Sequence, residues 1–379
     1  MAPRRVGAGG RGCSGFSPCW AAQPLTVVLN AGKPGGYCHN VPIFDVSASD
    51  IADLDDAALR RLVAELCRAE LAAAGLPTSA VTDGGDQRAP DDGVDVRVDV
   101  AGTPEDLDFI PHGTSLFQVK QQMTFRDRDI RTEMSPGGVL RPAIARLGGS
   151  GGAYVIVSGR ESLPPERVEA RQATMRALVP VGVKVAFYDG TAVARWTSKH
   201  PAVMLWVRQQ LGRGLNGWEP YGNWSAPGQP DDERYIIDEQ TPRVSLGLGR
   251  GREAVSVPVG IMRMRERLSQ PSGIVRLVGL SGTGKTRLAQ ALFDDSIGDG
   301  ALPKVEALYT DMARGPQPAP QEVIAQLSSQ QRSAVLVIDN CLAATHRILA
   351  DEVRRRCGRC RRGCGGKWGG VVSGLFRKP

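Results

Sequence analysis

The clearest helical pattern in the chain lies between residues 54 and 74. Its apolar residues recur at intervals of three and four positions, as one face of an α-helix requires: Leu59, Leu62, Val63 and Leu66. Gly75 and Pro77 follow, and both residue types are typical of the end of a helix. The pattern therefore predicts an amphipathic helix over 54–74.

The rest of the first half of the chain predicts strands separated by a helix. Residues 94–100 alternate between valine and charged residues, as expected of a strand with one buried face. Three further apolar runs predict strands at 115–120, 154–157 and 183–188. A helix is predicted across 166–178, so the alternation indicates one α/β domain over 45–200.

A second α/β pattern begins near residue 253. It predicts strands at 274–278, 305–310 and 334–338 and helices at 285–293 and 321–331. The run at 334–338 is apolar throughout, which is typical of a buried strand in a parallel sheet. We therefore expect a second domain over 253–353, joined to the first by an aromatic- and glycine-rich connector at 201–252.

Length and composition agree with two folded domains. The 379 residues correspond to about two domains at roughly 100–200 residues each. A hydrophobic content of 41% is enough to build apolar cores, which excludes wholesale disorder. No apolar run approaches the ~20 residues that cross a bilayer, so we expect no membrane-spanning segment.

The net charge of +7 is concentrated at the two ends of the chain. Residues 1–40 contain four basic residues and no acid, and residues 354–379 contain nine basic residues and no acid. The body between them is acidic overall, so the high isoelectric point does not predict a basic face for nucleic acid. We expect 1–44 to be a disordered or non-native extension.

Most of the cysteines lie in the same two ends. Only Cys67 and Cys341, of eight, belong to the body of the chain. This usage is typical of a reduced protein without a disulfide framework, and it predicts a cytoplasmic location.

Residues 279–286 match the pattern of a phosphate-binding loop. The sequence Gly-Leu-Ser-Gly-Thr-Gly-Lys-Thr fits G-x-x-x-x-G-K-[ST] and stands between a predicted strand and a predicted helix. Lys285 would contact the β- and γ-phosphates of ATP or another NTP, and Thr286 would bind Mg²⁺. The backbone of the loop would surround the phosphates through Gly279, Ser281, Gly282, Thr283 and Gly284.

Asp339 ends the apolar run at 334–338, at the sheet edge where open α/β proteins bind ligands. It would hold Mg²⁺ together with Thr286. Asn340 follows, where many ATPases carry a carboxylate that polarises the attacking water, and an amide cannot act as a general base. The sequence thus predicts nucleotide binding and leaves hydrolysis open.

A second group of polar residues lies on the first two predicted strands. Gln118 and Lys120 are two positions apart, so both would point to one face, and Asp95 would join them in a hairpin. Asp95 and Gln118 would then bind Mg²⁺, and Lys120 would stabilise the transition state of phosphodiester hydrolysis. Glu65 or Glu70, on the preceding helix, would complete the metal shell. On spacing alone, an ordinary solvated hairpin is the alternative.

These residues resemble a known family. Asp-x-Gly-Val-Asp95 followed by Phe-Gln-Val-Lys120 resembles the PD-(D/E)xK restriction-endonuclease-like fold, in the variant where glutamine replaces the middle acid. Together with the segments 75–87, 218–224 and 337–341, the chain is similar over about 45–350 to a bacterial architecture. That architecture joins such a nuclease to a STAND-type NTPase.

The resemblance implies a function and a set of site residues. STAND proteins of this layout are implicated in defence against phage, where a C-terminal sensor recognises the invader and NTP-bound assembly activates the nuclease on DNA. By position, Asp95, Gln118 and Lys120 match the nuclease motif. Asp91 is the second candidate for the metal-binding acid.

The pattern of an NTPase breaks off after Asp339. Only about three of the five or more strands of such a core are recognisable, so the NTPase domain looks incomplete. Residues 354–379 are rich in Gly, Arg and Cys and carry no hydrophobic periodicity. Three alternatives are open for this tail: translation out of frame, a basic nucleic-acid tail, or a zinc site. The zinc site would combine Cys357, Cys360 and Cys364 with Cys341 or His346.

The sequence therefore predicts an α/β protein with a restriction-endonuclease-like mixed sheet followed by an incomplete parallel-sheet P-loop NTPase domain. The expected function is a Mg²⁺-dependent DNA endonuclease controlled by NTP binding, assembling as a homo-oligomer when activated. The alternative is a non-catalytic regulator, gated by nucleotide, whose N-terminal domain only binds DNA or a protein partner.

Overall fold

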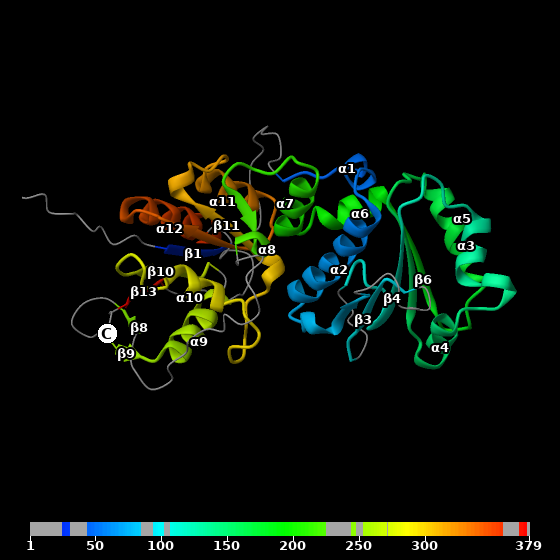
Figure 1. Cartoon of the computed structure of the whole chain (residues 1–379), viewed down its shortest axis with the longest axis horizontal. Coiled ribbons are helices and arrows are strands. Elements are labelled where there is room, and N and C mark those ends of the chain that lie inside the picture. Colours follow the sequence, from blue (N-terminus) through cyan, green and yellow to red (C-terminus); the bar gives the residue numbers. More distant parts are fainter. Residues whose placement is uncertain are drawn as a thin grey trace, which may run out of the picture.

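The computed structural model of the chain describes residues 25–30, 44–84, 94–101, 107–224, 244–247, 253–270, 272–358 and 371–376 (Figure 1). Within these ranges the protein is an α/β protein with two mixed β-sheets. The first sheet has five strands and is formed by the first half of the chain. The second sheet is formed mainly by the second half.

The five-strand sheet has the order β2-β3-β4-β5-β6. Its strands are β2 (Val81–Asp83), β3 (Val96–Asp99), β4 (Thr114–Lys120), β5 (Ala153–Ser158) and β6 (Lys184–Asp189). The pairs β2–β3 and β3–β4 are antiparallel, whereas β4–β5 and β5–β6 are parallel. The expected hairpin between the first two predicted strands is therefore confirmed as β3–β4, and the expected mixed sheet is present.

Helices cover both faces of this sheet (Figure 1). Along β4, Phe117 and Val119 point into the core under α2, whereas Leu116 belongs to the core on the opposite face. The helices of this half are α1 (Ala48–Ala52), α2 (Asp56–Ala73), α3 (Asp127–Met134), α4 (Pro142–Ser150), α5 (Pro165–Arg176) and α6 (Gly190–Thr197). Because successive side chains of a strand alternate between faces, Gln118 and Lys120 lie on the side of α3 and α5.

The second sheet has the order β7-β11-β12-β1-β10-β13-β8-β9. Its strands are β1 (Leu25–Asn30), β7 (Trp218–Pro220), β8 (Val244–Leu246), β9 (Glu253–Val255), β10 (Ile274–Val278), β11 (Ala307–Asp311), β12 (Ala334–Asp339) and β13 (Val371–Phe376). The accompanying helices are α8 (Tyr221–Trp224), α9 (Val257–Leu268), α10 (Lys285–Ala291), α11 (Pro320–Ser329) and α12 (Ala343–Gly358). Short 3-10 turns complete the chain at Thr78–Ala80, Pro136–Gly138, Lys304–Glu306 and Met312–Arg314.

The second sheet differs from the parallel sheet that the sequence predicts. The pairs β11–β12 and β10–β13 are parallel, but β1 lies between β10 and β12 and runs antiparallel to both. Residues 25–30 belong to the stretch expected to be a disordered or non-native extension, and instead they form this strand. A gap between two strands exposes backbone N–H and C=O groups, which any short extended segment can pair with, whatever its side-chain pattern.

The C-terminal part also differs from expectation. The sequence pattern ends near residue 353, yet helix α12 continues to Gly358 and residues 371–376 form β13 beside β10. The segment expected to be a connector, 201–252, contributes α7 (Pro201–Gln210) as well as β7 and α8.

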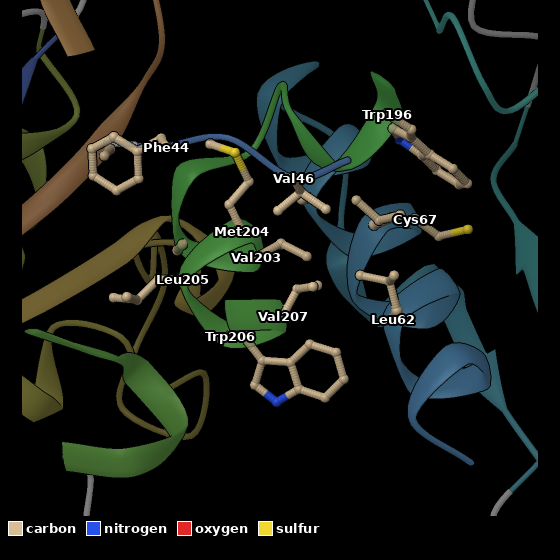
Figure 2. Packing of buried hydrophobic residues seen from close by; sticks show 14 of the residues in the cluster. Phe44, Val46, Leu62, Cys67, Trp196, Val203, Met204, Leu205, Trp206 and Val207 are labelled. Atoms are coloured by element: carbon tan, nitrogen blue, oxygen red, sulfur yellow. The ribbon is translucent and has the colours of Figure 1, made fainter. Parts of the chain in front are cut away.

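Helix α7 packs into the core that the two halves of the molecule share. Residues 201–207 are all buried, and their cluster contains side chains from α2 as well as from the second sheet. Figure 2 shows Val203, Met204 and Val207 between Leu62 on one side and Phe44 on the other, with Leu205 on the side of Phe44. A helix that is apolar around its whole circumference has no one-faced pattern, so sequence periodicity does not reveal it.

Candidate functional sites

The phosphate-loop residues connect strand β10 to helix α10, as the pattern requires. Gly282 and Gly284 have φ angles of 76° and 82°, in the left-handed region that glycine adopts without a steric penalty. Thr283 Oγ1 donates to the carbonyl oxygen of Leu280 at 2.8 Å, which closes the turn. These glycine conformations are compatible with a loop whose N–H groups surround an anion.

Lys285 is held by the loop itself. Its Nζ donates to the carbonyl oxygens of Gly279 at 3.2 Å and Leu280 at 2.8 Å, and the residue is only 7% exposed. Burial lowers the pKa of Lys285, and the nearby carboxylate of Asp339 opposes this effect. A bound phosphate would take the place of the two carbonyl oxygens and supply the negative charge that they lack.

Thr286 and Asp339, which are far apart in sequence, meet in the structure. Thr286 Oγ1 donates to Asp339 Oδ2 at 2.8 Å, and the Tyr309 hydroxyl lies 3.4 Å from the same oxygen. A hydroxyl and a carboxylate next to a phosphate loop are the hard oxygen ligands that Mg²⁺ prefers. These residues therefore fit a Mg²⁺-nucleotide, with Thr286 and Asp339 as the protein ligands of the ion.

Two further polar residues join this edge of the sheet. Asn340 has a φ angle of 51° and donates from its side-chain amide to Asp311 Oδ1 at 2.7 Å. The sequence did not identify Asp311. Its signal was nevertheless present, because Asp311 follows the strand predicted at 305–310 in the same way that Asp339 follows the strand at 334–338.

Aromatic residues from the segment expected to be a connector pack beside the nucleotide site. Trp224 stacks on Tyr309 with ring centres 4.7 Å apart and planes 13° apart. Gln290, on the helix that follows the phosphate loop, donates to the Trp224 carbonyl oxygen at 2.9 Å. Helix α8 is thus fixed to both α10 and β11.

In the first half of the molecule, Asp95 and Gln118 form a buried pair. The backbone N–H of Asp95 bonds the Phe117 carbonyl oxygen at 2.9 Å, which places Asp95 beside the end of β4. Its Oδ2 accepts hydrogen bonds from Gln118 Nε2 at 2.8 Å and from the Val119 N–H at 2.7 Å. Asp95 and Gln118 are 7% and 4% exposed.

Lys120 lies on the same face of β4 and forms an ion pair with a residue that the sequence did not identify. Its Nζ is 2.8 Å from Glu133 Oε2, and Glu133 Oε1 is 3.0 Å from the guanidinium of Arg141. Glu133 belongs to α3, a short helix with only two buried apolar residues, which the sequence analysis did not predict. The acid that pairs with Lys120 is therefore Glu133 on α3.

The two glutamates proposed on the preceding helix lie elsewhere. Both Glu65 and Glu70 belong to α2, which covers the opposite face of the sheet. Glu65 pairs with Arg68 at 3.1 Å, and Glu70 accepts from the Phe109 N–H at 2.8 Å. Burial raises the pKa of each carboxyl. The structure brings together Asp95, Gln118 and Lys120 without either glutamate. Asp91 lies outside the described residues.

Arg60 on α2 occupies the space in front of Asp95. Its Nε is 3.1 Å from Asp95 Oδ1, and its terminal nitrogen is 2.8 Å from Asp56. Beside this pair, the side-chain oxygen of Gln118 is buried and has no hydrogen-bond partner in the described part of the chain. An unsatisfied oxygen next to a carboxylate fits a cation, and the Asp95 carboxylate would bind one after Arg60 withdrew.

The surface opens next to these residues. A cavity of about 370 Å³ is lined by Asp55, Asp56, Arg60, Lys120, Gln121, Gln122 and Arg160. Three of these side chains are basic and two are acidic, and Arg60 and Lys120 already form ion pairs with Asp95 and Glu133. Asp95 and Gln118 do not line it, in agreement with their burial behind Arg60.

Within the described ranges, no cluster of three His, Cys, Asp or Glu residues is arranged to hold a metal ion. A cation at Asp95 would therefore depend on the Gln118 amide oxygen, backbone carbonyls and substrate oxygens. For the suggested zinc site, Cys341 and His346 are both buried. Cys357 lies near the end of α12, and the other two candidates, Cys360 and Cys364, lie outside the described residues.

None of the helices in the described ranges is long and apolar enough to span a bilayer. Comparison with family models, with curated proteins and with solved structures found no match to this chain.

Proposed function

We propose that the protein is a metal-dependent DNA endonuclease whose activity is controlled by binding of a Mg²⁺-nucleotide. The observation that supports this most directly is the buried contact of Asp95 with Gln118, on the same face of the hairpin as Lys120. It supplies a carboxylate, an unsatisfied amide oxygen and a lysine beside a cavity that opens to solvent.

Each of these residues has a chemical role in the proposed reaction. Asp95 and the Gln118 oxygen would hold Mg²⁺, which supplies an activated water and neutralises phosphate charge when bound. Lys120 would stabilise the charge that develops on the phosphate, and Glu133 would hold the lysine in place. The fold of this half would then be restriction-endonuclease-like, as the sequence resemblance implies.

The second half supports the nucleotide-binding part of the proposal. The 2.8 Å contact between Thr286 and Asp339 supports a Mg²⁺-nucleotide bound between the loop and the end of β12. By the same resemblance, we propose a STAND-type module, assembly of several copies when nucleotide is bound, and a role in cytoplasmic defence against phage.

One observation favours a second candidate function. Both oxygens of Asp95 have protein partners, because Oδ1 faces Arg60 and Oδ2 accepts from Gln118 and Val119. A domain in which this arrangement is permanent would bind DNA or a protein partner without cleaving it. The protein would then be a nucleotide-gated regulator.

DNA cleavage by the full-length chain tests the two candidates. We expect cleavage with Mg²⁺ or Mn²⁺ and ATP, and a loss of about 10²–10³-fold for Lys120→Ala. Lys184→Ala serves as the matched control, since Lys184 is an exposed lysine on β6. DNA binding without cleavage in every metal would favour the regulator, and equal cleavage by wild type and Lys120→Ala would exclude the proposed site.

A further inference from the structure

Two neighbouring strands of the second sheet end in a carboxylate at the same edge. Asp311 on β11 is directly in register with Asp339 on β12, and the two strands are parallel. Since neighbouring strands are about 4.8 Å apart, Asp311 lies one strand spacing beyond the residue proposed to hold Mg²⁺. The nucleotide edge therefore carries a second acid.

Asp311 is held in a defined orientation. Its Oδ1 accepts hydrogen bonds from the Asn340 side-chain amide at 2.7 Å and from the Ala313 N–H at 2.9 Å. Both of these hydrogen bonds end on Oδ1, and neither involves Oδ2. A carboxylate oxygen can accept further hydrogen bonds, so Oδ2 can accept one from a water molecule.

Asn340 is placed by an uncommon backbone conformation. Its φ angle of 51° lies in the left-handed region, which asparagine tolerates better than most other residues. Its N–H donates to Asp339 Oδ1 at 2.8 Å while its side chain donates to Asp311. A single residue thus connects the two carboxylates, although its own amide cannot take up a proton.

We propose that Asp311 is the catalytic base of nucleotide hydrolysis at this site and that Asn340 is the residue that positions it. This inference rests on the proposed nucleotide binding. Asp311 Oδ2 accepts a proton from the water whose oxygen bonds the γ-phosphorus, and the bond from that phosphorus to the β–γ bridging oxygen breaks. The products are the nucleoside diphosphate and inorganic phosphate, to which the proton on Asp311 is then returned.

The other groups at this edge are committed to different contacts. Asp339 accepts a hydrogen bond from the Thr286 hydroxyl, and Lys285 is a cation that would contact the phosphates. Glu219 on β7 pairs with Arg314 at 2.7 Å. In the described part of the edge, Asp311 is the carboxylate that combines a fixed orientation with an oxygen that can accept from water.

Separate measurement of ATP binding and ATP hydrolysis on the full-length chain tests this inference. We expect Asp311→Asn to lower kcat by about 10²–10⁴-fold, the usual contribution of a general base. The Kd for ATP should change by less than about twofold, because the base does not contribute to ground-state binding. Glu219→Gln is the matched control and should leave kcat unchanged.

The exchanged double variant Asp311→Asn with Asn340→Asp provides a rescue. The double variant again contains one carboxylate and one amide, at exchanged positions. We expect its kcat to be at least about tenfold higher than that of Asp311→Asn. A purely structural role for Asp311 would not produce this recovery.

Three outcomes would overturn the inference. The first is a kcat of Asp311→Asn within about twofold of the wild-type value. The second is a loss of ATP binding in that variant as large as its loss of hydrolysis. The third is a wild-type chain that binds ATP without hydrolysing it. A wild-type chain that does not bind ATP would overturn the proposed nucleotide site itself, so the two failures are distinguishable.

Discussion

Two basic side chains, Arg60 and Lys285, each make a protein contact that binding of the proposed ligand would break. Arg60 faces Asp95 where a cation would bind, and Lys285 is bonded to two carbonyl oxygens where a phosphate would bind. Each site thus carries a protein contact in the position of its proposed ligand. Binding at either site requires that this contact be broken, which lowers the apparent affinity of the ligand.

Removal of the Arg60 contact should favour a divalent cation. We expect Arg60→Gln to lower the Mn²⁺ concentration for half-maximal DNA cleavage by about three- to tenfold, since a competing charge worth about 1 kcal/mol is lost. The measurement is a metal titration of cleavage. Arg61→Gln is the control, because Arg61 lies over the Trp206 ring instead of at Asp95. An increased metal requirement for Arg60→Gln would contradict the expectation.

Glu306 should make stability depend on pH. Burial raises the pKa of Glu306 to about 7, from an ordinary value of 4.5. The folded state therefore holds a proton that the unfolded state has released, and the free energy of unfolding falls as pH rises from about 4.5 to 7. We expect Glu306→Gln to be more stable than wild type by about 1–3 kcal/mol at pH 8, and the difference to vanish near pH 4.

Thermal unfolding as a function of pH measures this effect. Glu253→Gln, a change at an exposed glutamate on β9, is the comparison. A stability difference between Glu306→Gln and wild type that stays constant from pH 4 to pH 8 would exclude the titration of Glu306 as its cause.

At the scale of elements, helix α7 contributes to the packing that holds the two halves of the molecule together. It lies in the core that joins the two halves, with Leu205 completely buried. We expect Leu205→Ala to cost about 2–5 kcal/mol of stability through the cavity it leaves. Circular dichroism and tryptophan fluorescence should report the same lowered transition, whereas Gln210→Ala, at the exposed end of the helix, should change little. Two separate transitions would show that the halves unfold independently.

Much of the fold could be predicted from the sequence because the strands have clear patterns. The strand predicted at 274–278 coincides with β10, and the alternation in 94–100 marks β3. Helices α3 and α7 were missed for opposite reasons, one being largely polar and the other apolar all round. Strand β1 was missed because its pairing depends on a gap in the sheet that no local pattern encodes.

The candidate sites were predictable where they depend on spacing along the chain. Gln118 and Lys120 share a face because they are two positions apart, and the phosphate loop is continuous in sequence. Glu133 and Arg60 were not identified, since each acts through a contact with a distant segment. Asp311 was also missed, although it follows a predicted strand just as Asp339 does. Glu65 and Glu70 were chosen for their helix, but that helix covers the other face of the sheet.

At the scale of the whole molecule, one core contains side chains from both halves. Because α7 is shared, a ligand that binds only the folded state should stabilise both halves together. We expect ATP at about 100 times its Kd to add about 2.7 kcal/mol to the free energy of unfolding, seen equally by both spectroscopic probes. Lys285→Ala should abolish the shift. An increase in stability reported by only one of the probes would indicate that the two halves unfold independently.

Arg265 on α9 connects the nucleotide helix to a cleft about 870 Å³ in volume. Its buried guanidinium donates to backbone carbonyl oxygens at the end of α10 and in the following loop, among them Ala291, Leu292 and Asp299. That loop forms one wall of the cleft, and α2, which carries Arg60, forms another.

Because Arg265 is hydrogen-bonded to both the loop and the end of α10, we expect the loop and the helix to move together as one rigid unit. A tilt of α10 around a bound phosphate would therefore change the width of the cleft. The distance between fluorescent labels on Ser79 and Asp295, which both line the cleft, should therefore change when nucleotide binds, and Arg265→Lys should remove that change.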